Sequence, residues 1–270
     1  MKEESLMDLL NEFDGNKLKQ ELVGQAPFPH FCIDDFLKED FAEEVYQSFP
    51  SYQEAEEAGK GFSSVNEKKK VQITDSSKFP PPIKKLHDLL ASKEYVDMWS
   101  DLTGIPNLFA DTELKGGGVH ETNTGGHLDV HVDFNYVADK KYHRRLNILI
   151  YFNKEWKEEY GGYLDIWDKD VKKRHGYFEP KFNRACGFVT SEISFHGVTP
   201  ITCPEGISRK SFATYYYTTE APTGWTGEKH STVFRARPEE WVKGNLLMPY
   251  EKVVRQIKKI FMGLKTRVKR

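Results

Sequence analysis

Hydrophobic positions change their spacing near residue 107, and the change divides the chain into two parts. Before it, residues 5–23 show the spacing of an amphipathic helix. Residues 38–49 return to helical spacing after an acidic start, and residues 80–105 contain one or two further helices that begin at prolines. The pattern therefore predicts that residues 1–107 are mostly helical.

Two segments depart from this helical texture. The run "APFPHFCIDDFL", residues 26–37, has prolines at its entry and then apolar residues typical of a short strand. Residues 51–78 are rich in Glu, Lys and Ser and lack periodic apolar positions, which predicts a mobile surface excursion. Whether this excursion covers an active site as a lid stays open at this point.

Alternating, β-rich runs punctuated by Gly occupy residues 108–219. Because no helix-length segment separates these short strands, they predict a barrel or sandwich and not an alternating α/β fold. The chain then becomes loop-rich, and residues 250–270 place apolar side chains on one helical face and Lys or Arg elsewhere. We expect one domain over residues 1–270, with a helical N-terminal part, a β core and a C-terminal loop and basic helix over residues 220–270.

The basic tail has two interpretations. Its apolar face can pack against the rest of the protein while its charges face water, which we favour. Alternatively, an apolar stripe flanked by Lys and Arg can rest on an anionic membrane surface as a peripheral contact. The second interpretation would favour a lipid-linked or cell-surface sugar as substrate.

Composition narrows the class of protein. The 270 residues are 38% hydrophobic and 30% charged, with a formal net charge of -2. These values describe a globular protein, and the near-neutral charge argues against a nucleic-acid partner. The N-terminus lacks the basic start and long apolar run of a secretory signal. Three widely spaced cysteines fit neither a disulfide framework nor a zinc knuckle, so we expect a cytoplasmic location.

The stretch "GGHLDVHVDFNY" contains His-X-Asp twice, once at His127 and Asp129 and once at His131 and Asp133. Side chains at positions i and i+2 of a strand point the same way, so either pair can bind one ion. An oxygen-activating iron(II) site takes two imidazoles and one carboxylate on one face of the metal. His196 ends the strand-like run "FVTSEISFHGV" and suits the role of the distant third ligand. Strand periodicity alone does not separate the two pairs.

Several motifs resemble the iron(II)- and 2-oxoglutarate-dependent oxygenases of the prolyl 4-hydroxylase type. They are "HVDFN", "RRLNILIYFN", "GGYLDIWD", "FHGV" and "SRKSFATYYY". The resemblance covers roughly residues 26–219 and is strongest from Gly116 onward. It implies an α+β fold with a mainly β core, a double-stranded β-helix of the jelly-roll or cupin type, supported by N-terminal helices.

The resemblance also implies the iron ligands. In the family, the His-X-Asp motif is followed within about a dozen residues by Arg and then by an apolar strand. The sequence fits this interval if His131 and Asp133 are the ligands, with His196 as the third. His127 and Asp129 are then expected on the same strand face one step earlier, near the mouth of the site or behind the ligands.

The cosubstrate contacts follow from the same resemblance. Arg209 matches the residue that binds the far carboxylate of 2-oxoglutarate, and a guanidinium suits a two-pronged grip on a carboxylate. Lys210 is rejected because strand alternation turns it to the other face. Tyr151 matches a tyrosine that adds a hydrogen bond to that carboxylate, and Leu164 matches an apolar position that lines the cosubstrate.

The resemblance implies a dioxygenase that uses Fe(II), 2-oxoglutarate and O2, with ascorbate as an optional addition, and His131, Asp133, His196 and Arg209 as catalytic residues. Because Asp133 is a carboxylate, hydroxylation of an unactivated C–H bond is favoured over halogenation. The leading hypothesis is hydroxylation of a prolyl or other residue of a protein. The alternatives are hydroxylation of a small molecule, sugar or lipid-linked glycan, and a non-catalytic binding module.

Overall fold

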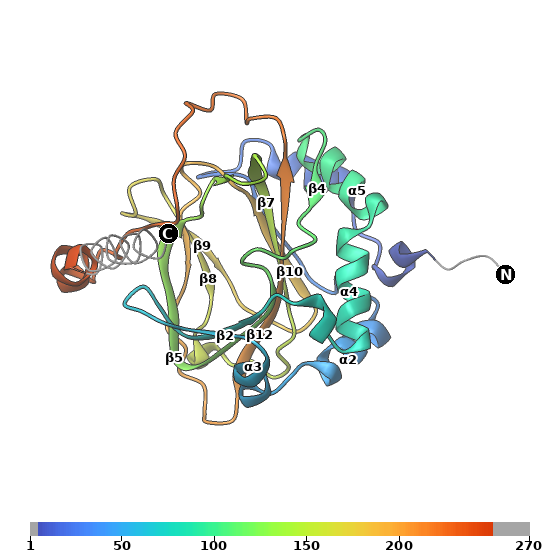
Figure 1. The fold of residues 1–270 in the computed structure, drawn as a ribbon, viewed down its shortest axis with the longest axis horizontal. Coiled ribbons are helices and arrows are strands. Elements are labelled where there is room, and N and C mark those ends of the chain that lie inside the picture. The colour runs from blue at the N-terminus through green and yellow to red at the C-terminus, as the bar shows by residue number, and fades with distance from the viewer. Residues whose placement is uncertain (1–4, 251–270) are drawn as a thin grey trace, which may run out of the picture.

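The computed structural model describes residues 5–250. The predicted basic helix at residues 250–270 therefore lies, apart from its first residue, outside the described part of the chain. A 13-stranded antiparallel sheet curves around itself, and the helices α2, α4 and α5 lie along one side of it (Figure 1). This arrangement confirms the predicted α+β class with a mainly β core. Among the described residues, no helix has the length and apolar character needed to cross a bilayer.

The helices lie mainly in the N-terminal part of the chain. Where one helix was predicted over residues 5–23, the structure has a short 3-10 turn and then α1, because the Asp14 side chain accepts a hydrogen bond from the Lys17 amide at 2.9 Å and starts a new helix. The predicted helices near residues 38–49 and 80–105 are confirmed as α2, α4 and α5. The helical elements are α1 (Gly15–Leu22), α2 (Glu39–Ser48), α3 (Tyr52–Ala58), α4 (Pro81–Ala91), α5 (Lys93–Thr103), the 3-10 turns η1 (Leu6–Leu9), η2 (Ser76–Lys78) and η3 (Glu158–Tyr160), and the π-helical turn η4 (Lys243–Leu247).

Ten of the thirteen strands lie from residue 109 onward, as predicted, and three lie earlier. They are β1 (His30–Ile33), β2 (Lys60–Ser63), β3 (Glu67–Ile73), β4 (Phe109–Ala110), β5 (Gly118–Val132), β6 (Tyr136–Val137), β7 (Tyr142–Tyr151), β8 (Leu164–Trp167), β9 (Arg174–Phe178), β10 (Arg184–Val189), β11 (His196–Val198), β12 (Ser208–Thr218) and β13 (Val233–Phe234).

The prediction that residues 51–78 lack regular structure was wrong. A capping box between Ser51 and Glu54 starts α3, and β2 and β3 then form a hairpin. Strand β3 joins the main sheet by pairing with β5, for example Gln72 opposite His120. The polar composition that suggested a loop reflects β2 and the first half of β3, whose residues are exposed or half-buried.

Strand β5 connects the two halves of the sheet. Its first half pairs with β12, with Ser211 opposite His120. Its second half pairs with β11, with His196 opposite His131. The strand order is β1-β10-β7-β12-β5-β11-β8-β9, so β5 belongs to both halves of the sheet. Side chains from both halves line one cavity.

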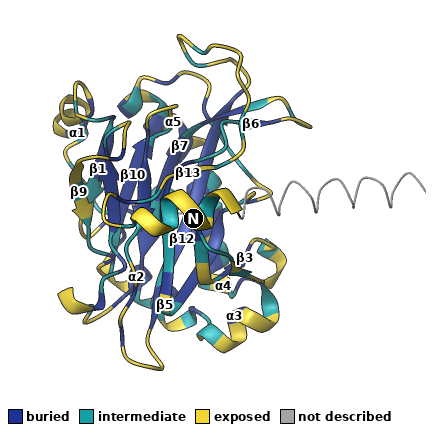
Figure 2. Ribbon diagram, turned by 90° about the vertical axis from the view of Figure 1, so that its left-hand side faces the viewer, coloured by how far each residue is buried: buried dark blue, intermediate teal, exposed yellow. Residues whose placement is uncertain are grey.

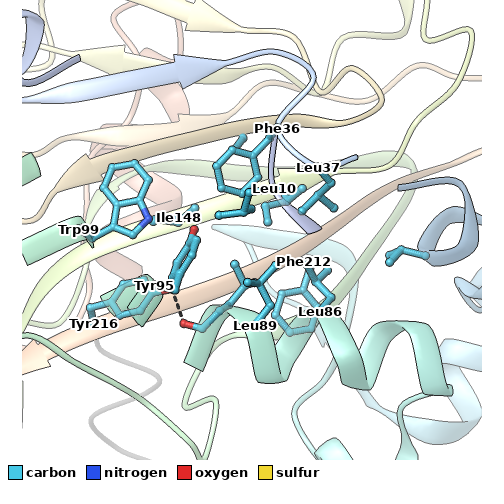
Figure 3. Packing of buried hydrophobic residues seen from close by; sticks show 14 of the residues in the cluster. Leu10, Phe36, Leu37, Leu86, Leu89, Tyr95, Trp99, Ile148, Phe212 and Tyr216 are labelled. Atoms are coloured by element: carbon cyan, nitrogen blue, oxygen red, sulfur yellow. Dashed lines mark hydrogen bonds between the residues drawn. The ribbon is translucent and has the colours of Figure 1, made fainter. Parts of the chain in front are cut away.

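The largest hydrophobic cluster lies between the helices and the β7–β12 half of the sheet. Figure 3 shows Leu86 and Leu89 of α4 and Tyr95 and Trp99 of α5 near side chains of the sheet such as Phe212. The strands of this half are largely buried, whereas the outer faces of the helices are exposed (Figure 2). This packing fixes β7 and β12 as a rigid platform for the site on their opposite face.

Candidate active site

His131, Asp133 and His196 converge in the cavity between the two halves of the sheet. One potential ligand atom from each residue lies within 4.8 Å of the others. His131 Nε2 lies 3.5 Å from Asp133 Oδ1, and His196 Nε2 lies 3.6 Å from Asp133 Oδ2. The direct pairing of His196 with His131 across β11 and β5 places both rings on the same side of the sheet.

Backbone hydrogen bonds fix the orientation of both imidazoles. His131 Nδ1 lies 2.8 Å from the Asp129 carbonyl, and His196 Nδ1 lies 2.9 Å from the Ser194 carbonyl. Each carbonyl accepts a hydrogen bond from Nδ1–H, which leaves Nε2 with a free lone pair directed at the convergence point. Burial, together with the neighbouring His131, lowers the pKa of His196 to about 3. The His196 ring is therefore neutral, which is the form that binds a metal ion.

Two side chains of β7 hold the Asp133 carboxylate. Asn147 Nδ2 donates to Asp133 Oδ2 at 2.7 Å, and Arg144 Nη2 lies 3.1 Å from the same oxygen. Burial acts to raise the pKa of Asp133, but Arg144 and the two histidines outweigh it and hold that pKa well below its usual range. The carboxylate is therefore ionised, with Oδ1 on the side of His131.

Arg209 and Tyr151 form a second polar group in the same region. Arg209 is 3% exposed and its Nε donates to the Gly162 carbonyl at 2.7 Å, while its guanidinium lies 4.8 Å from the centre of the Tyr151 ring. Arg209 Nη2, the Tyr151 hydroxyl and the Ser211 hydroxyl are all buried and make no hydrogen bond within residues 5–250. Burial raises the pKa of Tyr151 well above its usual range, so its hydroxyl stays a donor.

These buried donors without partners are available to bind an anion. An unsatisfied buried donor costs free energy unless a ligand completes it. A carboxylate that reaches Arg209, Tyr151 and Ser211 would satisfy all three. The residues present therefore fit 2-oxoglutarate at this end of the site and a metal ion at His131, Asp133 and His196, whose two neutral nitrogens and one carboxylate suit Fe(II).

The remaining sequence-predicted residues lie as follows. Leu164 of β8 lines the cavity, and Lys210 points away from it to form an ion pair with the buried Glu121 at 2.8 Å. The expectation that His127 and Asp129 share the strand face of the ligands was wrong for Asp129. Between the pairs Val198–Leu128 and His196–His131 the register shifts, so β5 has one residue more than β11.

This β-bulge turns the Asp129 carboxylate away from the site. It is fully buried and forms an ion pair with Lys243 instead. His127 Nε2 lies 3.1 Å from the Val65 carbonyl and 3.4 Å from Lys243 Nζ, at the edge of the cavity. The His127–Asp129 pair is therefore not brought together with His196.

A cavity of about 320 Å³ surrounds these groups. Its size lies within the ~300–1,000 Å³ typical of small-ligand sites. Apolar side chains such as Phe188 lie beside the imidazoles together with the polar group around Asp133, and further lining residues come from the β2–β3 hairpin and from the segment that contains β13. The lining includes Lys60, Phe62, Lys70, Gln72, His120, Leu149, Leu164, Phe188, Val198, Tyr215, Thr232 and Phe234.

Sequence reasoning missed four contributors. Arg144, Asn147, Ser211 and Phe234 were not among the predicted site residues. Asn147 precedes Tyr151 by four positions and Ser211 follows Arg209 by two, so strand alternation could have placed each on the same face as that predicted site residue. No local signal points to Phe234, because it reaches the site through a pairing with β5 over a hundred residues earlier.

Comparison with known proteins identifies the domain. Residues 117–217 match the sequence profile of the 2OG-Fe(II) oxygenase superfamily. The chain carries a 2OG-Fe(II) oxygenase domain. This is the domain of 2-oxoglutarate-dependent dioxygenases, whose cofactors are Fe(II), 2-oxoglutarate and O2. No curated protein sequence matches the chain significantly.

Solved structures show that the oxygenase has the double-stranded β-helix fold. A prolyl hydroxylase from Trichoplax adhaerens, in complex with a hypoxia inducible factor peptide fragment, is 19% identical, with a TM-score of 0.54 over 75% of this chain and 90% of that chain. Prolyl 4-hydroxylases from Phytophthora capsici are 20% identical, with a TM-score of 0.52 over 80% of this chain and 67% of that chain. The predicted fold is thereby confirmed.

Proposed function

We propose that this oxygenase hydroxylates an unactivated C–H bond in a protein, at a prolyl or other residue. His131, Asp133 and His196 hold Fe(II), while Arg209 and Tyr151 bind the far carboxylate of 2-oxoglutarate. The observation that carries the proposal is the presence, in one cavity, of a convergent His-Asp-His set and of Arg209, whose buried Nη2 makes no hydrogen bond within residues 5–250.

When bound, Fe(II) and 2-oxoglutarate supply an oxidative decarboxylation that yields succinate and carbon dioxide and transfers one oxygen atom to the substrate. The protein contributes binding and orientation. His131 and His196 present Nε2 because their Nδ1 atoms donate to backbone carbonyls. Asn147 and Arg144 hold one oxygen of Asp133, so that the other oxygen faces the metal position.

The far end of the site neutralises charge. Arg209 is oriented by its bond to the Gly162 carbonyl, and its free Nη2 faces an ionised group of the cosubstrate with little competition from water. The Tyr151 hydroxyl adds a neutral donor. Apolar side chains, including Leu149, Leu164 and Phe188, line the space between these donors and the imidazoles and exclude water from it.

Two observations favour a protein substrate. The outer lining of the cavity comes from two separate segments, with exposed Lys60 and half-buried Phe62 on one side and half-buried Thr232 on the other. A mouth bounded by two segments suits an extended chain that presents one side chain. The two similar structures are prolyl hydroxylases, one of them with a peptide fragment bound. At 19% and 20% identity they support this substrate class by likeness of fold alone.

The test incubates the metal-loaded protein with 2-oxoglutarate and O2 in two arms. One arm contains a mixture of proline-containing peptides, and the other contains a mixture of sugars and nucleotide sugars. We expect succinate release that peptides stimulate, with one oxygen atom added to a peptide residue. Stimulation and oxygen insertion only in the sugar arm would contradict a protein substrate, and no succinate in either arm would contradict the catalytic proposal.

A further inference from the structure

Residues that follow the family match, which ends at residue 217, lie against the candidate metal site. Strand β13 (Val233–Phe234) pairs with the end of β5, placing Phe234 opposite His131. Directly opposed residues of antiparallel strands point to the same side of the sheet. The Phe234 ring centre accordingly lies 5.3 Å from that of His131, and Phe234 lines the cavity.

Phe234 completes a row of rings around the two imidazoles. The centres of His131 and His196 are 4.3 Å apart, and Phe188 of β10 lies 4.3 Å from His196 on the far side. Phe188 and Phe234 therefore flank the two imidazoles. Because a backbone carbonyl fixes only Nδ1 of His131, contact with the Phe234 ring limits the remaining freedom of the imidazole to tilt.

A buried cluster of ion pairs holds residues 233–237 against the sheet. Arg237 is 6% exposed; its Nη2 lies 3.1 Å from Asp165 Oδ2, and its Nη1 lies 3.9 Å from Asp129 Oδ1. Asp165 is on β8 and Asp129 is on β5, and both are fully buried. Lys243 also pairs with Asp129, and Glu240 contacts both cations at the surface. Arg237 thus joins three segments of the chain.

The Arg237–Asp165 ion pair leaves room only for glycine at position 197. A β-carbon at Gly197 would lie 2.9 Å from Asp165 Oδ1 and 3.0 Å from Arg237 Nη2. The Arg237–Asp165 pair therefore lies directly over the backbone of β11, one residue from His196. The Arg237–Asp165 ion pair and Phe234 lie on opposite faces of the strands that carry the imidazoles.

We propose that Phe234 is a positioning residue for the His131 imidazole and that Arg237 acts through it, by holding residues 233–237 on β5 and β8. This inference rests on the proposed metal site. It assigns a part in metal binding to a segment outside the matched residues 117–217.

The test measures binding of Mn(II), a redox-stable probe for the Fe(II) site, to the metal-free protein with 2-oxoglutarate present. An aromatic contact contributes enough to change the dissociation constant by about two- to tenfold, so Phe234→Ala should weaken Mn(II) binding within this range. Phe234→Tyr should retain the affinity of the unmodified protein. Val233→Ala is the matched control, because Val233 is the 42% exposed neighbour on the same strand and should leave Mn(II) binding unchanged.

The role of Arg237 is tested by a double-mutant cycle. Arg237→Gln should lower the melting temperature and also weaken Mn(II) binding, and adding Phe234→Ala to it should cause little further loss of affinity, since both act through one contact. Losses that add in the double variant would overturn the coupling between Arg237 and Phe234. Unchanged Mn(II) affinity in Phe234→Ala, while His131→Ala loses binding, would overturn this inference alone. Unchanged affinity in both would overturn the metal site itself.

Discussion

Arg144 and Asp133 form a mostly buried ion pair beside the candidate metal site, with Arg144 Nη2 3.1 Å from Asp133 Oδ2. Arg144 is 4% exposed, and its guanidinium also lies 3.6 Å from the centre of the Tyr215 ring. The pair keeps the carboxylate ionised before any metal arrives. It also occupies the oxygen that faces β7, so the opposite oxygen stays available.

Replacing Arg144 with Met should destabilise the metal-free protein by about 3 kcal/mol, because a buried carboxylate then loses its counter-charge. Added Mn(II) with 2-oxoglutarate should recover part of the lost stability, because the cation then neutralises the charge of Asp133. Urea unfolding with and without Mn(II) measures both effects. Arg145→Met is the matched control: Arg145 donates to the Thr218 hydroxyl at 3.1 Å and should cost less. Equal losses in the two variants would contradict the role of the pair.

Tyr151→Phe should weaken binding of 2-oxoglutarate without loss of stability. The hydroxyl makes no hydrogen bond within the described chain, so its removal breaks no hydrogen bond of the ligand-free protein. Losing one neutral donor should raise the KM for 2-oxoglutarate by about fivefold, which corresponds to about 1 kcal/mol. Succinate release at varied 2-oxoglutarate, together with the melting temperature, checks this. An unchanged KM would show that the cosubstrate does not reach Tyr151.

Arg209→Ala should raise the same KM more strongly than Tyr151→Phe, by about 30-fold or more, because a charge-assisted contact is lost from a buried site. Arg209→Lys should recover part of the loss, since it keeps the charge but not the fork of the guanidinium. A KM in Arg209→Ala equal to that of the unmodified protein would place the cosubstrate elsewhere in the cavity.

The stability of the metal-free protein should fall as the pH decreases from about 7 towards 5. Burial lowers the pKa of His120 well below its usual range, so the folded state keeps this ring neutral while the unfolded state takes up a proton near pH 6.5. Below that pH the unfolded state binds more protons, which lowers the free energy of unfolding by at most about 1.4 kcal/mol per pH unit for this group.

His120→Asn isolates this contribution from those of other groups. Glu121 and Asp129 have raised pKa values and act in the opposite direction. Urea midpoints at about pH 7.5 and pH 5.5 should therefore differ less in the variant than in the unmodified protein. Equal pH dependence in both would show that His120 takes up its proton without unfolding.

The sequence predicted the parts of this protein that depend on local periodicity. The β runs around Ile148, His131 and Tyr215 appear as strands because alternation and β-branched or aromatic residues reflect burial of one face. The family motifs then selected His131 and Asp133, and the structure brings them together with His196. Local pattern and motif order were sufficient to propose these positions.

What the sequence did not predict depends on pairings between distant segments. The run Lys68–Lys70 reads as a polar loop, yet β3 is a strand because β5 offers it an edge. The bulge that turns Asp129 away from the metal site follows from the register of β5 with β11, which alternation along one strand cannot predict. Phe234 and Arg237 reach the site only through contacts made after the sheet has formed.

Iron stoichiometry in single-residue variants tests the central claim most directly. Anaerobic titration of the metal-free protein with Fe(II) in the presence of 2-oxoglutarate should show about one ion per chain for a single mononuclear site. This binding should be lost in His131→Ala, Asp133→Ala and His196→Ala and kept in His127→Ala. Loss of iron from His127→Ala, with binding retained in His131→Ala, would contradict the account.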